Sequence, residues 1–259
     1  MNYDEYAALP GIRFSRLKLI GRSPLHYRDH VDTDTTSRGM LRAIHGLALE
    51  PDTFDADFAI YTGKVRRGKA YDEFRAAHEG RTILNQREHD QAARVAGAIL
   101  GHHIAGPLLS DGKAEHSIQW VDGPTGIECK ARLDFVAPGP MVLDLKTYGT
   151  TDPRVIARRV VQLGAHVQAA HYVDGVATIY DVPAADVRYL LICAEDKPPF
   201  DVAVVELEHD GARLAGRHTR AQWMARLVEC RASDEWPGRC PEIVPLDLPD
   251  YAFPDLEIE

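Results

Sequence analysis

Residues 127–147 read IECKARLDFVAPGPMVLDLKT and give the most informative structural signal in the chain. Its first half alternates apolar and polar residues, the pattern of a β-strand with one buried face. The turn residues PGP at 138–140 follow, and a second alternating run comes after them. The sequence therefore predicts a β-hairpin that places Asp134, Asp144 and Lys146 beside one another, with Asp144 and Lys146 on the same side of their strand.

Two carboxylates and a lysine on one face of a sheet suit hydrolysis assisted by a hard cation. Carboxylate oxygens bind Mg²⁺ or Mn²⁺, and the bound cation lowers the pKa of a coordinated water molecule. A neighbouring ammonium group can orient that water or stabilise charge that develops on a phosphate. A solvent-exposed hairpin with a charged outer face has the same alternation, so other segments have to decide between the two interpretations.

His45 is a candidate ligand from an upstream helix. Residues 36–50 have the pattern of a helix, with Thr36 or Ser37 as its cap and Pro51 just past its end. The apolar stripe of this helix is predicted to contain Met40, Leu41, Ile44, Leu47 and Ala48. His45 lies at the margin of the stripe, where one imidazole suits Mn²⁺ or a mixed ligand set. A histidine in that place can also be an ordinary core or surface residue.

Two further segments offer polar side chains to the same region. Residues 114–120, AEHSIQW, alternate like a strand that carries Glu115 on one side. Downstream, the second of two predicted helices places Gln168 and Tyr172 four residues apart, hence on one face. Their hydrogen-bonding tips can hold a phosphate or a metal-bound water, although such a pair is also common in structural roles.

Taken in order, these residues resemble a known family of enzymes. His45, Glu115, Asp134, Asp144-Leu-Lys146 and Gln168-x-x-x-Tyr172 look like the PD-(D/E)xK nuclease superfamily, and more narrowly its RecB-type branch. The flanking segments are similar to the nuclease domain of the exodeoxyribonuclease VIII (RecE) type: GIRFSRLK at 11–18, SPLHY at 23–27, LEP at 49–51 and RGKAY at 67–71. Two departures, Leu133 for the proline and Asp144 for a glutamate, leave the metal-binding chemistry unchanged.

The resemblance implies a role for each residue in a metal-dependent active site. His45, Asp134 and Asp144 would be metal ligands, and Glu115 would support the metal shell directly or through water. The metal would be Mg²⁺, with Mn²⁺ as a possible substitute.

Three more residues would act on the water and the phosphate. Lys146 would position or activate the attacking water, and Gln168 and Tyr172 would organise the site and the scissile phosphate. The implied activity is a DNase that digests duplex DNA from its ends with 5′ to 3′ polarity in phage-type recombination. The implied partners are a single-strand annealing protein and further copies of the chain in a ring-shaped homo-oligomer.

Two other functions share this pattern. An endonuclease or a flap-trimming nuclease would need the same site. A DNA-binding module that has lost turnover would keep the fold, although such a module tends to lose the lysine or an aspartate.

The architecture expected for the whole chain is α/β (α+β), a central mixed β-sheet flanked by helices in a single domain. The resemblance implies a restriction-endonuclease-like core. We expect a helical N-terminal part of about 1–105, a catalytic core of about 106–232 and an extended acidic tail of about 233–259. Further strands are predicted at 187–194 and 202–207, and further helices at 14–20, 85–100, 152–164 and 211–230. Asn85 and Glu88 form a capping box at the start of the second of these helices, and the third has Asp152 as its cap and Gly164 at its end.

Composition adds weaker constraints. The net charge of −9 argues little against a nucleic-acid partner, because binding depends on where charges lie. Basic clusters at 64–69 and 154–159 can follow phosphates or be ordinary solvated faces. No apolar run approaches the roughly 20 residues of a membrane span, and the first residues lack a signal-peptide pattern, so we expect a cytoplasmic protein. Without a C-x-x-C pair we expect no zinc site, and we place Cys129 and Cys193 in the core. Similar RecB-type nucleases that hold an iron–sulfur cluster have one cysteine upstream of the nuclease core and three downstream. Here no cysteine precedes His45, and only Cys230 and Cys240 lie late, so we expect no such cluster.

Overall fold

The central feature is a five-stranded mixed sheet with strand order β3-β4-β5-β6-β7. The computed structural model describes residues 3–31 and 38–249 of the chain. β5 and β6 are parallel, and the other neighbouring strands are antiparallel, as predicted for a mixed sheet. The strands are β3 (Lys113–Val121), β4 (Glu128–Ala137), β5 (Met141–Thr147), β6 (Arg188–Ala194) and β7 (Val202–Glu206).

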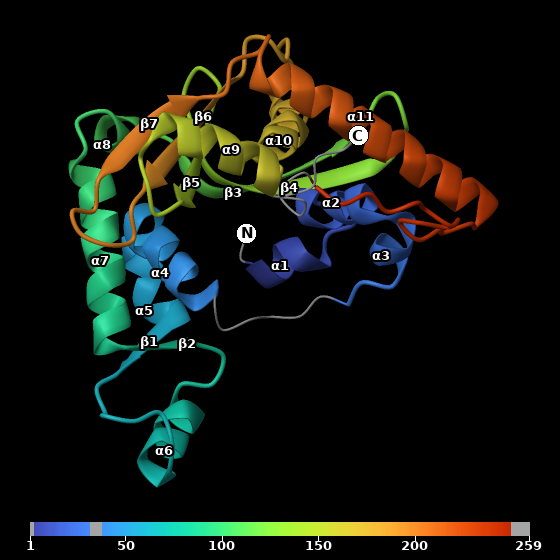
Figure 1. Ribbon diagram of the computed structural model, residues 1–259. Coiled ribbons are helices and arrows are strands. Elements are labelled where there is room, and N and C mark those ends of the chain that lie inside the picture. The colour runs from blue at the N-terminus through green and yellow to red at the C-terminus, as the bar shows by residue number, and fades with distance from the viewer. Residues whose placement is uncertain (1–2, 32–37, 250–259) are drawn as a thin grey trace, which may run out of the picture.

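Helices cover both faces of this sheet and form two apolar layers (Figure 1). Strand β6 shows the division clearly, since Tyr189, Leu191 and Cys193 belong to one layer while Leu190 and Ile192 belong to the other. The first layer contains α2 (Phe14–Arg22), α9 (Pro153–Leu163), α10 (Ala165–Tyr180) and α11 (Ala212–Ser233). The second contains α4 (Arg38–Leu49), α5 (Phe54–Asp57) and α7 (Gln86–Gly101).

Local sequence signals set several helix boundaries as predicted. Helix α7 begins at a capping box, in which the side chains of Asn85 and Glu88 each accept a hydrogen bond from the other's backbone N–H. Helix α9 begins at Asp152, whose side chain accepts from the N–H of Arg154. It ends at Gly164, whose left-handed φ of 76° favours a residue without Cβ.

The single buried face predicted for residues 127–135 is wrong. Cys129, Ala131 and Leu133 pack in the first layer, but Phe135 packs in the second. The side-chain alternation therefore reverses at Asp134, and the facing strand β3 has a φ of 45° at Glu115. Strands β3 and β4 pair in the same register before and after this point, with Ala114 opposite Phe135 and His116 opposite Leu133. Glu115 and Asp134 thus lie opposite each other at a local distortion that no pattern of alternation reveals.

Strand β4 also separates from its other neighbour, β5, near Asp134. The β4–β5 ladder stops at Phe135↔Leu143, and nearer the start of β4 the edge is taken by Ile12. The N–H of Ile12 donates to the carbonyl of Glu128 at 2.8 Å, and the N–H of Lys130 donates to the carbonyl of Ile12 at 3.0 Å. Between these two pairings the strands separate, and the predicted site residues lie in that opening.

The region 52–81, for which no helix or strand was predicted, contains short elements. A parallel pair, β1 (Phe58–Tyr61) and β2 (Thr82–Asn85), flanks α6 (Lys69–Ala77), and Figure 1 shows α6 standing away from the body of the molecule. Strands of four residues are too short for periodicity to detect. Other short elements are α1 (Tyr3–Ala8), α3 (Pro24–Arg28), η1 (Pro51–Thr53) and α8 (Ala105–Leu108).

The predicted stripe of α4 needs one correction. Leu41 is 39% exposed, whereas Ala43 is fully buried in its place. The proposed caps Thr36 and Ser37 lie outside the described residues. Cys129 and Cys193 are buried as predicted.

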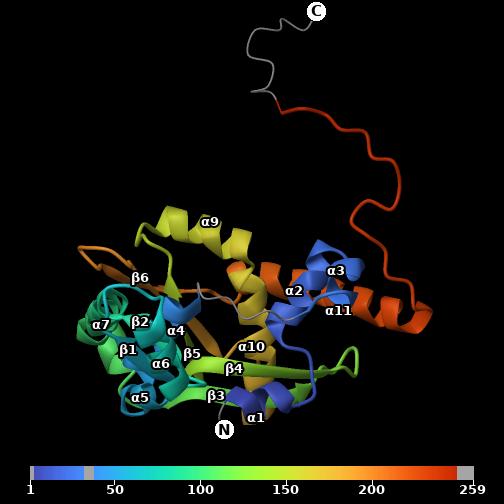
Figure 2. The ribbon, with the colours of Figure 1, turned by 90° about the horizontal axis from the view of Figure 1, so that it is seen from below.

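The C-terminal segment leaves the body of the molecule after α11. Trp236 stacks on Tyr27 with ring centroids 5.8 Å apart, and Arg239 donates to the carbonyl of Arg22. Beyond these contacts the described chain runs outward without helix or strand (Figure 2). Among the described helices, none is long and apolar enough to cross a membrane.

Candidate metal centre

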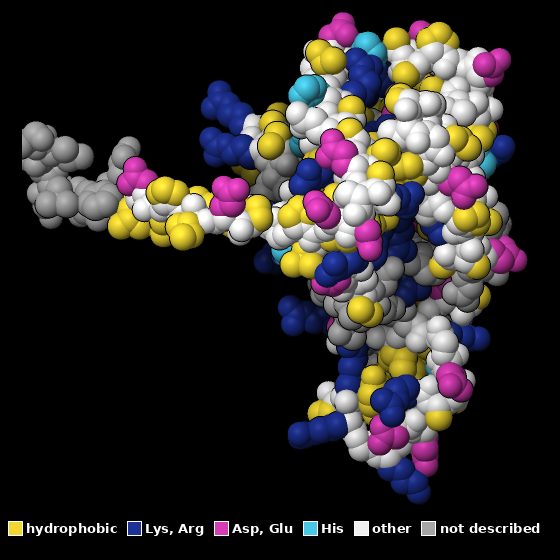
Figure 3. All heavy atoms as spheres, turned by 90° about the vertical axis from the view of Figure 1, so that its right-hand side faces the viewer, with side chains coloured by type: hydrophobic (Ala, Val, Ile, Leu, Met, Phe, Trp, Pro, Cys, Tyr) yellow, Lys and Arg dark blue, Asp and Glu magenta, His cyan; other side chains and the backbone are white. Residues whose placement is uncertain are grey.

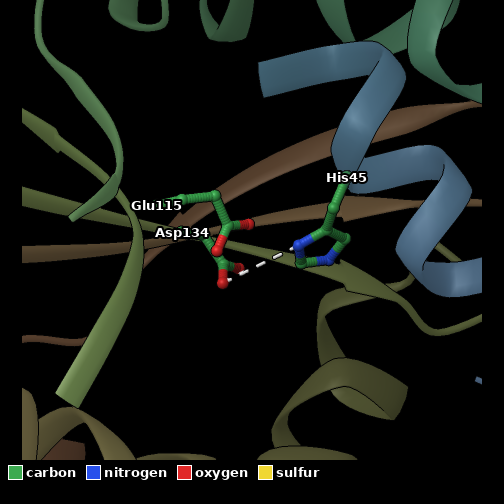
Figure 4. A group of neighbouring side chains, drawn as sticks. All are labelled: His45, Glu115 and Asp134. Atoms are coloured by element: carbon green, nitrogen blue, oxygen red, sulfur yellow. Dashed lines mark ion pairs between the residues drawn. The ribbon is translucent and has the colours of Figure 1, made fainter. Parts of the chain in front are cut away.

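His45, Glu115 and Asp134 form the core of the candidate site (Figure 4). One ligand atom from each lies within 4.8 Å of the others. Helix α4 supplies the imidazole, and the distorted pair of strands β3 and β4 supplies the two carboxylates. His45 points toward the carboxylates, because its Nδ1 lies 3.7 Å from a carboxylate oxygen of Asp134.

Asp134 is held in the opening between β4 and β5. Its Oδ2 accepts a hydrogen bond from the backbone N–H of Leu145 at 2.8 Å, replacing the ladder bond that the separated strands no longer make. Burial and the nearby Asp144 raise the pKa of Asp134 well above its ordinary value. The carboxylate therefore lies where a negative charge is costly unless a cation accompanies it.

Asp144, which is buried, and Lys146, which is half-buried, form an ion pair on β5. Lys146 Nζ donates to Asp144 Oδ1 at 2.9 Å and lies 2.7 Å from Oδ2. Burial opposes the charge on the ammonium, but Asp144 and Asp134 raise the pKa of Lys146, so it stays charged. Gln168 on α10 accepts from Lys146 Nζ at 3.3 Å, and its amide nitrogen lies 3.5 Å from Asp144 Oδ1.

Arg132 is a site residue that sequence reasoning missed. Its Nε donates to Glu115 Oε2 at 2.6 Å. This hydrogen bond fixes the side chain of Glu115 at the point where β3 is distorted. A signal was present, because Arg132 stands two residues before Asp134 among the polar positions of the strand. The alternating pattern predicts only that these residues share one face of the strand. It does not predict which side chain on that face bonds to which.

Tyr172 and a second tyrosine, Tyr189, lie near Asp144. Tyr172 is partly buried one turn after Gln168, and burial followed by the charge of Asp144 raises its pKa well above the ordinary value. Its ring centroid lies 6.5 Å from that of Tyr189 on β6. Tyr189 is fully buried, and burial and Asp144 raise its pKa as well. Tyr189 was not predicted, although a tyrosine stands out in the apolar run of β6.

The residues present fit a divalent cation. Three carboxylates face two cationic side chains, since Lys146 pairs with Asp144 and Arg132 pairs with Glu115. Asp134 has His45 as its ion-pair neighbour among the described residues, and burial lowers the pKa of that imidazole, which keeps it neutral. The buried atom His45 Nε2 also makes no hydrogen bond within the described structure. Hard oxygen ligands with one neutral imidazole suit Mg²⁺ or Mn²⁺.

A second buried polar cluster lies at the other end of β3 and has a different composition. Arg220 on α11 donates to Asp122 at 2.8 Å and lies 2.9 Å from Asp174 on α10. Its Nε donates to Nδ1 of His171 at 3.2 Å. Burial, then Arg220, lowers the pKa of His171 to about 3, so this imidazole is neutral and serves as an acceptor.

The structure therefore brings the seven predicted site residues into one region. His45, Glu115 and Asp134 form one group, and Asp144, Lys146 and Gln168 form a hydrogen-bonded group beside it, while Tyr172 lies one turn from Gln168. The ligand and catalytic roles assigned to them stay predictions. In the basic clusters, Arg66 bonds to Glu88 and Arg159 lies over the ring of Tyr148.

Comparison with known proteins agrees with this geometry. A family model described as a PDDEXK-like domain of unknown function (DUF3799) matches residues 14–247. The fold is similar to the crystal structure of a protein from Eubacterium rectale named "Putative exonuclease", with a TM-score of 0.63 over 98% of this chain and 96% of that chain. The two are 12% identical, so this similarity shows the fold. No curated protein matches the chain. The predicted resemblance to the PD-(D/E)xK superfamily is confirmed.

Proposed function

The chain belongs to this PDDEXK-like family, and on that premise we propose that it is a nuclease that hydrolyses DNA phosphodiester bonds with a divalent cation. One observation carries the proposal: an imidazole and two carboxylates converge beside an Asp–Lys ion pair in an opening of the sheet. A purely structural cluster would pair each of its carboxylates with a cation, and among the described residues Asp134 forms its ion pair with the imidazole of His45 and none with a lysine or an arginine.

The residues divide the chemistry between them. His45, Glu115 and Asp134 would hold the cation, with Asp144 beside them, and a bound cation supplies a water of lowered pKa and neutralises charge on the phosphate. Lys146 presents its ammonium from a position fixed by Asp144 and Gln168, where it can orient the attacking water or stabilise an anionic phosphate oxygen. Arg132 keeps Glu115 turned toward the centre.

The finer proposal is an Mg²⁺-dependent exodeoxyribonuclease that digests duplex DNA from its ends in the 5′ to 3′ direction. The order of the site residues and their flanking segments supports it, as does the name of the structurally similar protein. We further propose, on the same resemblance, a cytoplasmic homo-oligomer that works with a single-strand annealing protein in recombination.

Digestion of matched linear and closed circular duplexes tests the proposal. With Mg²⁺, linear DNA labelled at its 5′ ends should release label before internal fragments appear, while the circle stays intact. Mn²⁺ should substitute for Mg²⁺, and EDTA should abolish cleavage. Cleavage of the circle would assign the site to an endonuclease, early release of 3′ label would reverse the polarity, and full activity in EDTA would contradict the metal-dependent mechanism.

A further inference from the structure

A basic pocket lies at the start of β4, away from the metal centre. The cavity has a volume of about 750 Å³ and lies where the segment before α2, the β3–β4 turn, α3 and α11 meet. Arg13, Arg16 and Arg231 line it together with Tyr27. Figure 3 shows the face that carries α3 and the end of α11, and Lys and Arg side chains stand out there around the base of the C-terminal segment.

Tyr27 orients two of the three arginines. The guanidinium carbon of Arg16 lies 4.7 Å from the centre of the Tyr27 ring, and its Nη1 donates to the carbonyl of His30 at 2.8 Å. Arg231 donates to the Tyr27 hydroxyl at 3.5 Å. Stacking on Trp236 supports the Tyr27 ring. Guanidinium groups held in this way have already lost much of the freedom that binding an anion would otherwise cost.

The charge of the pocket favours an anion. Among the lining residues, three guanidinium groups accompany a single carboxylate, that of Glu128, in a chain whose net charge is −9. Lys130 also lines the pocket, but its ammonium donates to the carbonyls of Tyr6, Ala7 and Leu9 at the end of α1. Arginine is the residue best suited to phosphate oxygens, because its planar fork can donate two parallel hydrogen bonds.

The position of the pocket relative to the metal centre suggests which phosphate it holds. Lys130 and Asp134 stand four residues apart on β4, which corresponds to about 13 Å at about 3.3 Å per residue. A stacked nucleic-acid strand advances about 3.4 Å per nucleotide, so the spacing corresponds to about four nucleotides. A terminal phosphate next to the scissile bond would lie too close to the metal centre to reach the pocket.

We propose that this pocket binds an internal backbone phosphate of the DNA strand whose scissile phosphate lies at the metal centre. The pocket would be a second anchor that fixes the strand along β4, several nucleotides from the reaction. This inference rests on the proposed nuclease function and adds to it a specific substrate contact that lies outside the metal centre.

Equilibrium binding of a 20-base-pair duplex in Ca²⁺ tests the pocket. The variant Arg16→Gln/Arg231→Gln removes two lining charges from α2 and α11. The matched control, Arg22→Gln/Arg226→Gln, removes two exposed charges from the same helices outside the pocket. The pocket variant should bind at least about 10-fold more weakly than the control near 0.1 M salt. Its log–log salt slope should fall by about 0.9, because the pocket holds one phosphate and each phosphate contact contributes about 0.9.

A second variant changes the pocket in the opposite direction. Glu128→Gln removes the one carboxylate of the lining and should tighten binding, a result that misfolding cannot produce. Duplexes with 5′-phosphate and 5′-hydroxyl ends should show the same loss in the pocket variant, since an internal phosphate is the proposed ligand. A loss confined to 5′-phosphorylated DNA would overturn that assignment.

The outcomes separate this inference from the function on which it rests. A wild-type chain that neither binds nor cleaves duplex DNA would reject the proposed function, and the pocket assignment with it. A wild-type chain that binds and cleaves, with pocket and control variants equal in affinity and Glu128→Gln unchanged, would reject the pocket assignment alone.

Discussion

The two buried polar clusters of this protein, the metal centre around Asp134 and the cluster around Arg220, differ in how their charges are balanced. Arg220 contacts Asp122, Asp174 and His171 from the centre of its cluster. At Asp134 the corresponding neighbour is the neutral His45. Arg220 contacts both carboxylates of its cluster, whereas Lys146 and Arg132 pair with Asp144 and Glu115 and leave Asp134 beside a neutral imidazole.

The pKa values of the carboxylates in the two clusters show how a structural polar group differs from a functional one. In the Arg220 cluster, burial alone would raise the pKa of Asp122, but hydrogen bonds from Thr125 and Arg220 hold it below its ordinary value. In the metal centre, burial and Asp144 raise the pKa of Asp134. The protein therefore retains at Asp134 a group that costs stability, which is expected where the group serves a reaction.

Removing the cation of the balanced cluster should have the largest effect. Arg220→Met leaves Asp122 and Asp174 without their shared partner, and breaking a buried ion pair from one side costs about 3–5 kcal/mol. Denaturant unfolding should show a loss of that size. The exposed Arg226→Met on the same helix should change the free energy of unfolding by less than about 0.5 kcal/mol. A small loss for Arg220→Met would mean that the cluster is not structural.

Asp144→Asn should disable the other cluster without unfolding it. The substitution keeps the shape but removes a charge beside the proposed cation and from the pair with Lys146. Single-turnover cleavage of linear duplex in Mg²⁺ should slow by about 10²- to 10³-fold, which corresponds to about 2.7–4 kcal/mol of barrier. A folded variant that keeps more than about a tenth of the wild-type rate would place the metal site elsewhere.

Lys146→Ala should lower turnover more than DNA binding. The ammonium is held by Asp144 and Gln168, and losing one positioned electrostatic group slows catalysis by about 10²-fold. Affinity for duplex DNA in Ca²⁺ should change much less, because one phosphate contact among many carries a small share of binding. Normal single-turnover cleavage at saturating protein, together with weak binding, would make Lys146 a DNA contact instead.

Much of the fold could be predicted from the sequence, because strand alternation and helix caps are signals carried by neighbouring residues. The hairpin of β4 and β5, the capping box of α7 and the Asp152 cap of α9 were predicted because each depends on residues near one another in the chain. The four-residue strands β1 and β2 were not, since they are held by pairing across 24 positions, as in Phe58↔Thr82.

The site was predicted as a set of residues but not as a geometry. The order of residues named seven residues that the structure brings into one region, whereas the reversal of alternation at Glu115 and Asp134 is a tertiary distortion without a local signal. Arg132 and Tyr189 were missed for the same reason, because their importance comes from the side chains they contact. Arg220 was missed as well, although it organises the second cluster.

Asp134→Asn should stabilise the protein when no metal is present. Because burial in the folded state raises the pKa of Asp134, that state binds the proton more tightly than the unfolded chain. Stability is therefore lost as pH rises from the pKa of the unfolded chain through the folded pKa. Asparagine avoids this loss, so the variant should gain about 0.5–2 kcal/mol near pH 8 in EDTA, and the gain should shrink as pH falls toward 4. The matched change Asp122→Asn should lose stability. A loss in both variants would remove the distinction between the clusters.

The free energy of unfolding, measured as a function of Mg²⁺ or Mn²⁺ concentration, tests directly whether the folded protein binds a cation at Asp134. A cation that binds the folded protein at 100 times its Kd stabilises it by about 2.7 kcal/mol. The wild-type chain and Arg226→Met should both show this rise, and Asp134→Asn should lose most of it. An equal rise in Asp134→Asn, or none in the wild-type chain, would contradict the assignment of the His45, Glu115 and Asp134 cluster as the metal centre.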